Sequence, residues 1–208
     1  MIENILSMKQ ILLTCLIVFL VSCNSNKKRA AIGLSEFQIE LNNEYKDASK
    51  SPLKEADLKN FKGLDFFPIN ENVKVTAHLE KIPNSEFFFM KTTTDRLAEE
   101  RVYGILTFTL EGREFKLNIY QGKKLMNTKG FQDYLFLPFT DKTNGISSYS
   151  GGRYMDLRIT DGDSIELDFN KAYNPYCAYN SKYSCPIVPK ENHLDFEMNA
   201  GVMAFKKH

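Results

Sequence analysis

The sequence predicts a mainly β fold of the α+β class: a small antiparallel β-barrel or strongly curved sandwich capped by two N-terminal helices. Hydrophobic residues make up 43% and charged residues 25% of the 208 residues, which is ordinary for one globular domain with a sizeable core. Two helical patterns come first. After them, seven segments rich in β-branched and aromatic residues alternate with turn residues. The predicted strands are Val73–Leu79, Phe87–Thr93, Val102–Leu110, Phe115–Gln121, Tyr134–Pro138, Tyr154–Ile159 and Ile165–Phe169.

The first helix is predicted to begin at Ser35, because Ser35 and Gln38 have the spacing of a capping box. Phe37, Leu41 and Tyr45 then recur every four residues and give the helix an apolar face. This face is expected to pack on the sheet.

The second helix is predicted to open at Ser51-Pro52, because proline suits the first helical position, where its missing N–H would have no partner. Leu53, Leu58 and Phe61 would form its buried side, and Gly63 would end it. We expect the two helices to close one end of the sheet and the loop-rich end of the chain to close the other.

Two dipeptides are placed where tight hairpin turns belong. Glu111-Gly112 and Asp161-Gly162 each stand between predicted strands, and glycine with an acidic neighbour tolerates the positive backbone angles of such turns. Both are therefore predicted to join paired strands, and the second explains Asp161-Gly162-Asp163 better than a calcium loop does.

The beginning of the chain has the pattern of a bacterial lipoprotein signal. The apolar run Ile11–Val21 is shorter than the roughly 20 residues that span a bilayer. It ends in Ser22-Cys23, a small residue before cysteine, and a polar stretch follows. Because Glu3 is unusual in a positively charged leader, we expect translation to start at Met8 rather than Met1. The alternative is a cleaved secretory peptide with a chance cysteine.

This pattern predicts a signal peptide over residues 1–22, a lipid anchor and tether over residues 23–33, and a single globular domain over residues 34–208. Cys23 would carry diacylglycerol and an amide-linked acyl chain such as palmitate, and two or more chains anchor a protein stably. The expected partner is thus a membrane, at the periplasmic face of the outer membrane of the cell envelope. The net charge of +1 and the single compact basic run Lys27-Lys28-Arg29 exclude an extended nucleic-acid surface.

The second half of the chain carries its most unusual runs, which are Asp141–Gly145, Tyr149–Tyr154, Asp168–Asn170 and Tyr173–Asn180. Together with Tyr45-Lys46-Asp47, Ser51-Pro52-Leu53, Phe66–Ile69, Tyr183–Pro186 and Glu191-Asn192, they resemble the uncharacterised family called domain of unknown function 1684. The likeness spans nearly all of the chain after Cys23, and it implies no reaction, ligand or cofactor. Val188 and Val202 depart from the residues that the resemblance leads us to expect, namely a proline and an acidic residue.

Cys177 and Cys185 remain as a pair once Cys15 leaves with the signal and Cys23 is lipidated. In an oxidising envelope they are predicted to form a disulfide, which would stabilise the fold by about 2.5 kcal/mol. A metal site with His193 and Asp195 is the alternative, but its spacing matches no common zinc pattern. Redox activity is disfavoured because the close Cys-X-X-Cys spacing is absent.

Arg153 is the leading candidate for a ligand contact, because it follows Gly151-Gly152 and a guanidinium grips an anion through two hydrogen bonds. Alternatively, it pairs with Asp141, Asp156 or Asp168 and holds a loop.

Further ligand-binding candidates are Asn144, Asn170 and Asn174, which could instead hold turns, and Tyr149 and Tyr154, which could instead be packing residues. The same alternatives apply to Tyr173, Tyr176, Tyr179 and Tyr183.

Three functional hypotheses follow, and none requires a metal or another cofactor. The first is a lipoprotein that binds a small polar or anionic molecule at the loop-rich end. The second is a hydrolase that uses Asp141, Asp168 or Glu191, although the sequence has no serine-nucleophile elbow, His-Glu-X-X-His or phosphate-loop motif. The third is a structural or protein-binding component of the envelope.

Overall fold

The computed structural model describes residues 33–205 of the chain. The helices in this range are α2 (Glu36–Lys46), α3 (Glu55–Leu58) and α4 (Lys123–Met126), with short 3₁₀ turns η1 (Glu71–Val73), η2 (Phe169–Lys171), η3 (Tyr176–Ala178) and η4 (Lys190–Asn192). The strands are β1 (Lys74–Lys81), β2 (Phe87–Lys91), β3 (Leu97–Leu110), β4 (Arg113–Gly122), β5 (Tyr134–Asp141), β6 (Arg153–Arg158), β7 (Ser164–Asp168) and β8 (His193–Leu194). The seven predicted strands are all present.

The strands form one sheet in the order β6-β5-β4-β3-β1-β7, with β2 beside β3 and β8 beside β5. All the pairings are antiparallel except that of β8 with β5. The predicted mainly β, antiparallel fold is therefore confirmed.

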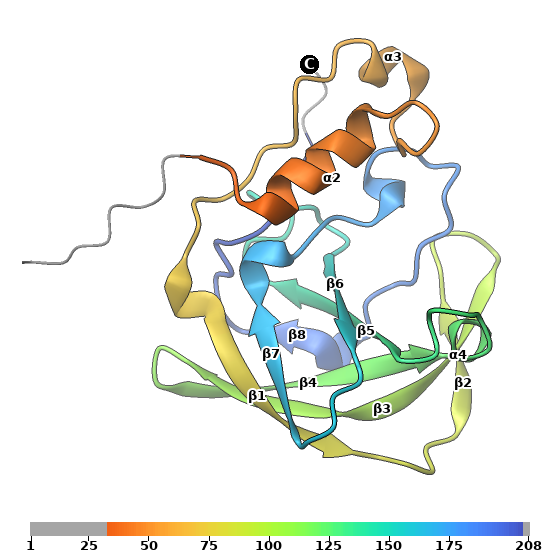
Figure 1. Cartoon of the computed structure of the whole chain (residues 1–208), viewed down its shortest axis with the longest axis vertical. Coiled ribbons are helices and arrows are strands. Elements are labelled where there is room, and N and C mark those ends of the chain that lie inside the picture. Colours follow the sequence, from red (N-terminus) through yellow and green to blue (C-terminus); the bar gives the residue numbers. More distant parts are fainter. Residues whose placement is uncertain (1–32, 206–208) are drawn as a thin grey trace, which may run out of the picture. The chain divides into compact units, whose positions relative to one another are not determined.

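The sheet curls until its two edge strands face each other (Figure 1). β6 and β7 are the ends of the strand order, yet only residues 159–163 separate them in the chain. β6 pairs with β5 and β7 with β1, so they are not partners. The hairpin predicted at Asp161-Gly162 is therefore wrong, and Gly162 lacks the positive φ of such a turn. This connection crosses from one edge of the sheet to the other and leaves a half-barrel.

The hairpin predicted at Glu111-Gly112 is present. Both residues have positive φ, 48° and 74°, and they join β3 to β4 with Leu110 opposite Arg113. These angles give a turn whose twist matches that of the flanking strands.

The long strand β3 changes partner part-way along one side. Its residues 97–101 pair with β2, and its residues 104–107 pair with β1. A bulge between Val102 and Gly104 marks the change. At Gly104 a Cβ atom would lie only 2.6 Å from the carbonyl oxygen of Glu80, so glycine allows β1 to approach closely.

The concave face of the half-barrel holds the main core. Alternate residues of the strands point into it, as the period of two requires. Its fully buried members include Ala77, Leu79, Leu106, Leu117, Ile119, Leu135, Leu137, Phe139, Leu167 and Phe169. A second cluster covers the opposite face of β4 to β6 and contains Met90, Ala98, Tyr120, Phe136, Tyr154 and Val188.

The helix α2 has the predicted capping box between Ser35 and Gln38. Its most buried residues are Gln38, Asn42 and Tyr45, whereas Phe37 and Leu41 are half-buried, so the buried face is turned from the predicted one. The Asn42 side chain accepts a hydrogen bond from the Leu64 N–H at 2.8 Å, which explains a polar residue in that face. The second predicted helix is reduced to the four residues of α3.

The two helices pack on the C-terminal segment. They do not lie at the end of the sheet opposite to that segment. Tyr45 meets Tyr179 edge-to-face with ring centroids 5.0 Å apart, and Leu53, Leu64 and Val202 share the same cluster. Figure 1 shows α2 and α3 on the side of the sheet where the C-terminal loops gather. The predicted closure of two opposite ends is therefore wrong. Within residues 33–205, no helix has the length and apolar character needed to cross a membrane.

Candidate functional site

Arg153, the first residue of β6, is completely buried. Its Nη2 donates to Oδ2 of Asp141 at 2.8 Å and to the carbonyl oxygen of Met198 at 2.7 Å, and its Nη1 donates to the carbonyl oxygen of Ala200. Burial lowers the pKa of Arg153, and the Asp141 carboxylate opposes that effect. The geometry is that of the alternative role: Arg153 fixes the C-terminal segment to the sheet. Its position offers no surface to a ligand.

Asn144 holds the loop between β5 and β6. Its Oδ1 accepts from the Asp141 N–H at 2.6 Å, and its Nδ2 donates to Ser148 Oγ at 2.9 Å and to the Tyr149 carbonyl at 2.7 Å. Its amide group is therefore occupied by the loop itself.

The other two predicted asparagines join distant segments. The Asn170 amide exchanges two hydrogen bonds of 2.9 Å with the backbone of Asn70, 100 residues earlier. The Asn174 amide donates to the Met203 carbonyl at 2.8 Å and to the Tyr179 hydroxyl at 3.3 Å. Both side chains are buried and hold the C-terminal loops in place.

Tyr149 and Tyr154 also have neighbours within the protein. The Tyr149 hydroxyl lies 3.9 Å from Cys177 Sγ, and the buried Tyr154 donates to the Pro186 carbonyl. The Tyr154 ring packs edge-on against Phe136 at 4.7 Å. Neither tyrosine faces an open cavity with Arg153, so the structure does not gather the predicted ligand-binding residues into one site.

Cys177 and Cys185 are free thiols in the structure, although they are neighbours: the Cys177 N–H donates to Cys185 Sγ at 3.1 Å. The structure describes the dithiol form of the pair, and the disulfide stays a prediction. His193 bonds instead with Thr140, and Asp195 pairs with Arg113 and Lys142. In the part of the chain that the structure describes, no three His, Cys, Asp or Glu side chains gather as a metal site.

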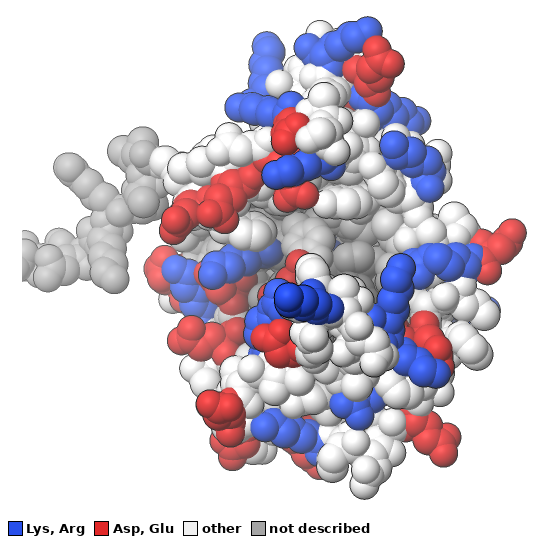
Figure 2. Space-filling model, turned by 45° about the vertical axis from the view of Figure 1, so that its right-hand side comes forward, with Lys and Arg blue, Asp and Glu red and all other residues white. Residues whose placement is uncertain are grey.

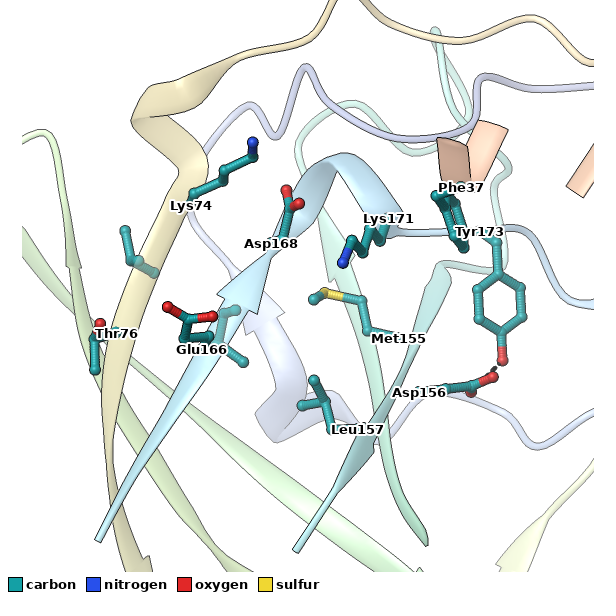
Figure 3. A pocket seen from close by; sticks show the side chains of 12 residues that line it. Phe37, Lys74, Thr76, Met155, Asp156, Leu157, Glu166, Asp168, Lys171 and Tyr173 are labelled. Atoms are coloured by element: carbon teal, nitrogen blue, oxygen red, sulfur yellow. Dashed lines mark hydrogen bonds between the residues drawn. The ribbon is translucent and has the colours of Figure 1, made fainter. Parts of the chain in front are cut away.

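A groove of about 580 Å³ lies between β6 and β7, and we call it the β6–β7 groove. It exists because the two edges of the curled sheet face each other without pairing. Its apolar lining includes Met155, Leu157 and Leu167, with Phe37 and Tyr173 also contributing. Figure 3 shows Met155 and Leu157 on β6 and the acidic pair Glu166 and Asp168 on β7.

Charged side chains of both signs line the β6–β7 groove. The Lys74 ammonium is held by Glu71 at 3.0 Å, a hydrogen bond that raises the pKa of Lys74. Asp168 caps η2 by accepting from Asn170. By contrast, the side chains of Lys171 and Glu166 have no hydrogen-bond or ion-pair partner among residues 33–205.

Lys171 is the side chain best placed to meet a ligand. In Figure 3 it points from η2 into the space between β7 and β6, above Met155. Over the face shown in Figure 2, basic and acidic side chains are interspersed, and a hollow opens near its centre.

The hydroxyl groups of two tyrosines fix one wall of the β6–β7 groove. Asp156 Oδ1 accepts hydrogen bonds from Tyr173 at 2.5 Å and from Tyr134 at 2.7 Å. Burial, and then the Asp156 carboxylate, raises the pKa of both hydroxyls well above the ordinary value. Both tyrosines therefore stay protonated at neutral pH and keep donating to Asp156.

The three acids considered for hydrolysis have different environments. Asp141 is buried and accepts from Arg153, from the Thr143 hydroxyl and from the Met198 N–H. Asp168 lines the β6–β7 groove, and Glu191 is exposed on η4. The structure therefore offers no carboxylate pair from this set.

Lys74, Glu166 and Lys171 were not predicted as site residues. All three are exposed, Lys74 in β1, Glu166 in β7 and Lys171 in η2, and no motif marks them. The signal that could have found them is structural, namely that β6 and β7 fail to pair.

A comparison with protein-family models matches residues 59–203 to the family described as protein of unknown function (DUF1684). The match covers the whole sheet and most of the C-terminal segment. The chain belongs to the DUF1684 family. No curated protein matches the sequence.

The fold has a solved relative. The chain is similar to an uncharacterised protein from Haloarcula marismortui, whose solution structure superposes with a TM-score of 0.65. The two sequences are 32% identical, and the likeness covers 82% of this chain and 92% of the other.

The two positions at which this DUF1684 chain departs from expectation are core positions. Val188 packs in the cluster with Tyr154, and Val202 lies beside Tyr45 and pairs with Phe66. Valine at both positions is therefore explained by packing.

Proposed function

We propose that this DUF1684 protein is a lipid-anchored protein of the bacterial cell envelope that binds a small polar molecule with an anionic group in the β6–β7 groove. The proposal keeps the class of ligand expected from the sequence and moves its site from the loops to the groove. The observation that carries it is the Lys171 ammonium, which has no ion-pair partner among the described residues and points into an open groove with a partly apolar lining.

The groove favours a ligand that carries both an anionic group and a hydroxyl or ammonium group. Its volume of about 580 Å³ suits a small molecule. Lys171 can bind a carboxylate or phosphate, while Glu166 can accept a hydrogen bond from a hydroxyl or ammonium group of the same ligand. Met155 and Leu157 would contact its hydrocarbon part. A short organic acid with hydroxyl or amino groups fits this arrangement.

The test begins with native mass spectrometry of the protein purified from its own host, before and after denaturation. We expect a mass that is lost on denaturation. The same protein is then titrated with acetate, inorganic phosphate and glutamate while amide chemical shifts are recorded. Binding in the groove should move the signals of residues on β6, β7 and η2.

The matched variants are Lys171→Met and Lys116→Met, because Lys116 is an exposed residue of β4 outside the groove. A charge-assisted contact contributes about 1.5–3 kcal/mol, so Lys171→Met should weaken binding by about ten-fold or more. Lys116→Met should leave it unchanged. A bare native mass together with unmoved shifts for all three probes would contradict the proposal and favour a structural or protein-binding role.

The envelope location rests on the lipoprotein pattern that ends at Cys23, which lies outside the described residues. In a Gram-negative host, Cys23→Ser should move the protein from the outer-membrane fraction to the soluble fraction and abolish labelling by a palmitate analogue. Ser25→Ala serves as the control and should keep both properties. Unchanged fractionation of Cys23→Ser would refute the anchor without affecting the groove.

A further inference from the structure

The two cysteines of the C-terminal segment form a local pair that ligand binding in the groove does not use. Cys177 is the central residue of η3, and its N–H donates to Cys185 Sγ at 3.1 Å. The backbone of Cys177 therefore already lies against the Cys185 sulfur, which places the two residues close enough in the fold for their side chains to react.

The two thiols differ in access. Cys185 is buried, with 6% of its surface exposed. It is anchored next to β2: its N–H donates to Thr93 Oγ1 at 3.1 Å and its carbonyl accepts from the Thr93 N–H at 2.9 Å. Cys177 is half-buried and therefore accessible from solvent. A second molecule therefore meets Cys177 before it meets Cys185.

The surroundings favour a thiolate at Cys177 and a thiol at Cys185. Hydrogen bonds from the Cys185 thiol, and then from the hydroxyls of Tyr149 and Thr93, lower the pKa of Cys177 to about 6, although burial opposes them. The pKa of Cys185 is raised by its hydrogen bond to Cys177 and by burial.

The other titratable groups around the pair preserve this difference in pKa between Cys177 and Cys185. Burial raises the pKa of Tyr149 to about 12, so it remains a donor. Tyr154 also stays protonated, and the Arg96 guanidinium acts on Cys185 in the direction opposite to burial. These contacts replace the effect that Cys-X-X-Cys spacing usually has on a thiol.

We propose that Cys177 and Cys185 form a thiol–disulfide exchange site whose substrates are disulfides of small molecules or exposed protein segments. The Cys177 thiolate attacks one sulfur of the substrate disulfide, forms a mixed disulfide and releases the other sulfur, which takes up a proton. Cys185 then loses its proton, and its sulfur attacks Cys177 Sγ. This step closes the Cys177–Cys185 disulfide and releases the second substrate sulfur as a thiol.

The electrons balance in this sequence. The two cysteines lose two electrons and become the disulfide expected from the sequence, and the substrate disulfide gains them and leaves as two thiols. The reverse reaction, with a thiol as reductant, returns the pair to the dithiol seen in the structure.

The test uses the full chain with Cys15→Ser and Cys23→Ser, so that Cys177 and Cys185 are its only cysteines. After treatment with oxidised glutathione, the protein should contain the internal disulfide and no lasting adduct. In the same background, Cys185→Ser should hold one glutathione on Cys177, and Cys177→Ser should hold none. Circular dichroism verifies that each variant is folded.

A second measurement distinguishes an activated thiolate from an accessible thiol. The rate at which iodoacetamide alkylates Cys177 is measured in the reduced protein with both cysteines and in Cys185→Ser. Both measurements are repeated in proteins that also carry Tyr149→Phe. In the reduced pair, Tyr149→Phe should shift the midpoint of the alkylation rate to higher pH. Tyr176→Phe is the matched control, because that hydroxyl bonds to Glu44 rather than to a thiol.

Two results would overturn the proposal. One is a Cys177–Cys185 disulfide that reduced glutathione opens only after the protein has been unfolded, since that is a structural disulfide. The other is a folded Cys185→Ser protein that takes up no glutathione. Neither result bears on ligand binding in the β6–β7 groove.

Discussion

The guanidinium of Arg153 and the carboxylate of Asp141 meet at 2.8 Å, and neither side chain has any exposed surface. The guanidinium also lies 5.6 Å from the ring of Phe67 and 5.5 Å from that of Phe139. This buried pair joins the start of β6, the end of β5 and the C-terminal segment. A buried charge is tolerated only while its partner is present, so the pair makes the position of these three segments interdependent.

Removing one member of this pair should therefore be severe. We expect Arg153→Met to lower the free energy of unfolding by about 3–5 kcal/mol, because Asp141 is then a buried charge without its partner. Urea denaturation followed by circular dichroism measures this loss. The double variant with Asp141→Leu should regain part of it.

The matched control is Arg158→Met. Arg158 pairs with Asp133 at 2.7 Å, but both side chains are about half exposed. Exposed pairs contribute about 0–1 kcal/mol, so this variant should lose no more than that. Equal losses in the two variants would show that the Arg153–Asp141 pair has no special role.

A second prediction concerns the junction of β4 and β5, where a single residue pair, Tyr120 and Phe136, is in register. Beyond this pair, the buried side-chain amide of Asn192 makes hydrogen bonds that a continued backbone pairing of β4 with β5 would otherwise make. Its Oδ1 accepts from the Asn118 N–H at 3.0 Å, and its Nδ2 donates to the carbonyls of Asn118 at 2.8 Å and Pro138 at 2.7 Å. Asn192→Ala would leave three backbone groups without partners.

We expect Asn192→Ala to cost about 3 kcal/mol of stability in urea denaturation, since each buried unsatisfied polar group costs about 1–3 kcal/mol and part of this is relieved by relaxation. Asn192→Asp should cost more, because a carboxylate cannot donate to the two carbonyls. Asn199→Ala, at an exposed position, is the control and should change stability by less than about 0.5 kcal/mol. Tolerance of both Asn192 variants would mean that β4 and β5 hold together without this amide.

The strands of this protein were predictable because their signal is local. β-Branched and aromatic residues with turn residues between them mark β1 to β7, and the positive φ angles at Glu111-Gly112 follow from the residue types. The two-residue β8 was missed, because His193-Leu194 is too short to show a period. The start of β3 at Leu97 was missed too, since the segment before Val102 is rich in charge.

The site was not predictable in the same way, because it depends on which strands are partners. A short turn usually joins paired strands, and that inference placed a hairpin where the sheet instead opens. Lys171 and Glu166 gain their significance only from this opening. For Arg153, the residue type left open a ligand contact or an internal ion pair, and the structure has the ion pair with Asp141.

The third prediction uses two glycines with similar backbone angles. Gly152 has a φ of 89°, and a Cβ atom there would lie 2.6 Å from the Phe139 carbonyl oxygen and 2.7 Å from Val188 Cγ2. Gly112 has a φ of 74° and open space around it. Gly112→Ala should therefore cost about 1–2 kcal/mol for the left-handed conformation alone.

Gly152→Ala should cost clearly more than Gly112→Ala, since backbone must also move to relieve the contact. Thermal unfolding of the two variants in one buffer measures the difference. Similar melting temperatures would indicate that the start of β6 adjusts freely, which would contradict the close approach at Gly152.

The fourth prediction concerns Glu100 on β3, whose Oε2 is buried and has no hydrogen-bond partner in the described part of the chain. Burial raises the pKa of Glu100 to about 7 from its ordinary 4.5, and Arg96 opposes the shift. Between these two values the folded state holds a proton that the unfolded state has lost. Stability must therefore fall as the pH rises from about 4.5 to 7, and the penalty is complete above pH 7.

Glu100→Gln removes this titration while keeping the shape of the side chain. At pH 5 the variant should be more stable than the wild type by less than about 1 kcal/mol, and at pH 8 by about 3 kcal/mol. Urea denaturation at the two pH values measures the difference, with Glu114→Gln as the control at an exposed position of β4. If the stability difference between Glu100→Gln and the wild type is the same at pH 5 and pH 8, then Glu100 does not change its ionisation between the folded and unfolded states in this range.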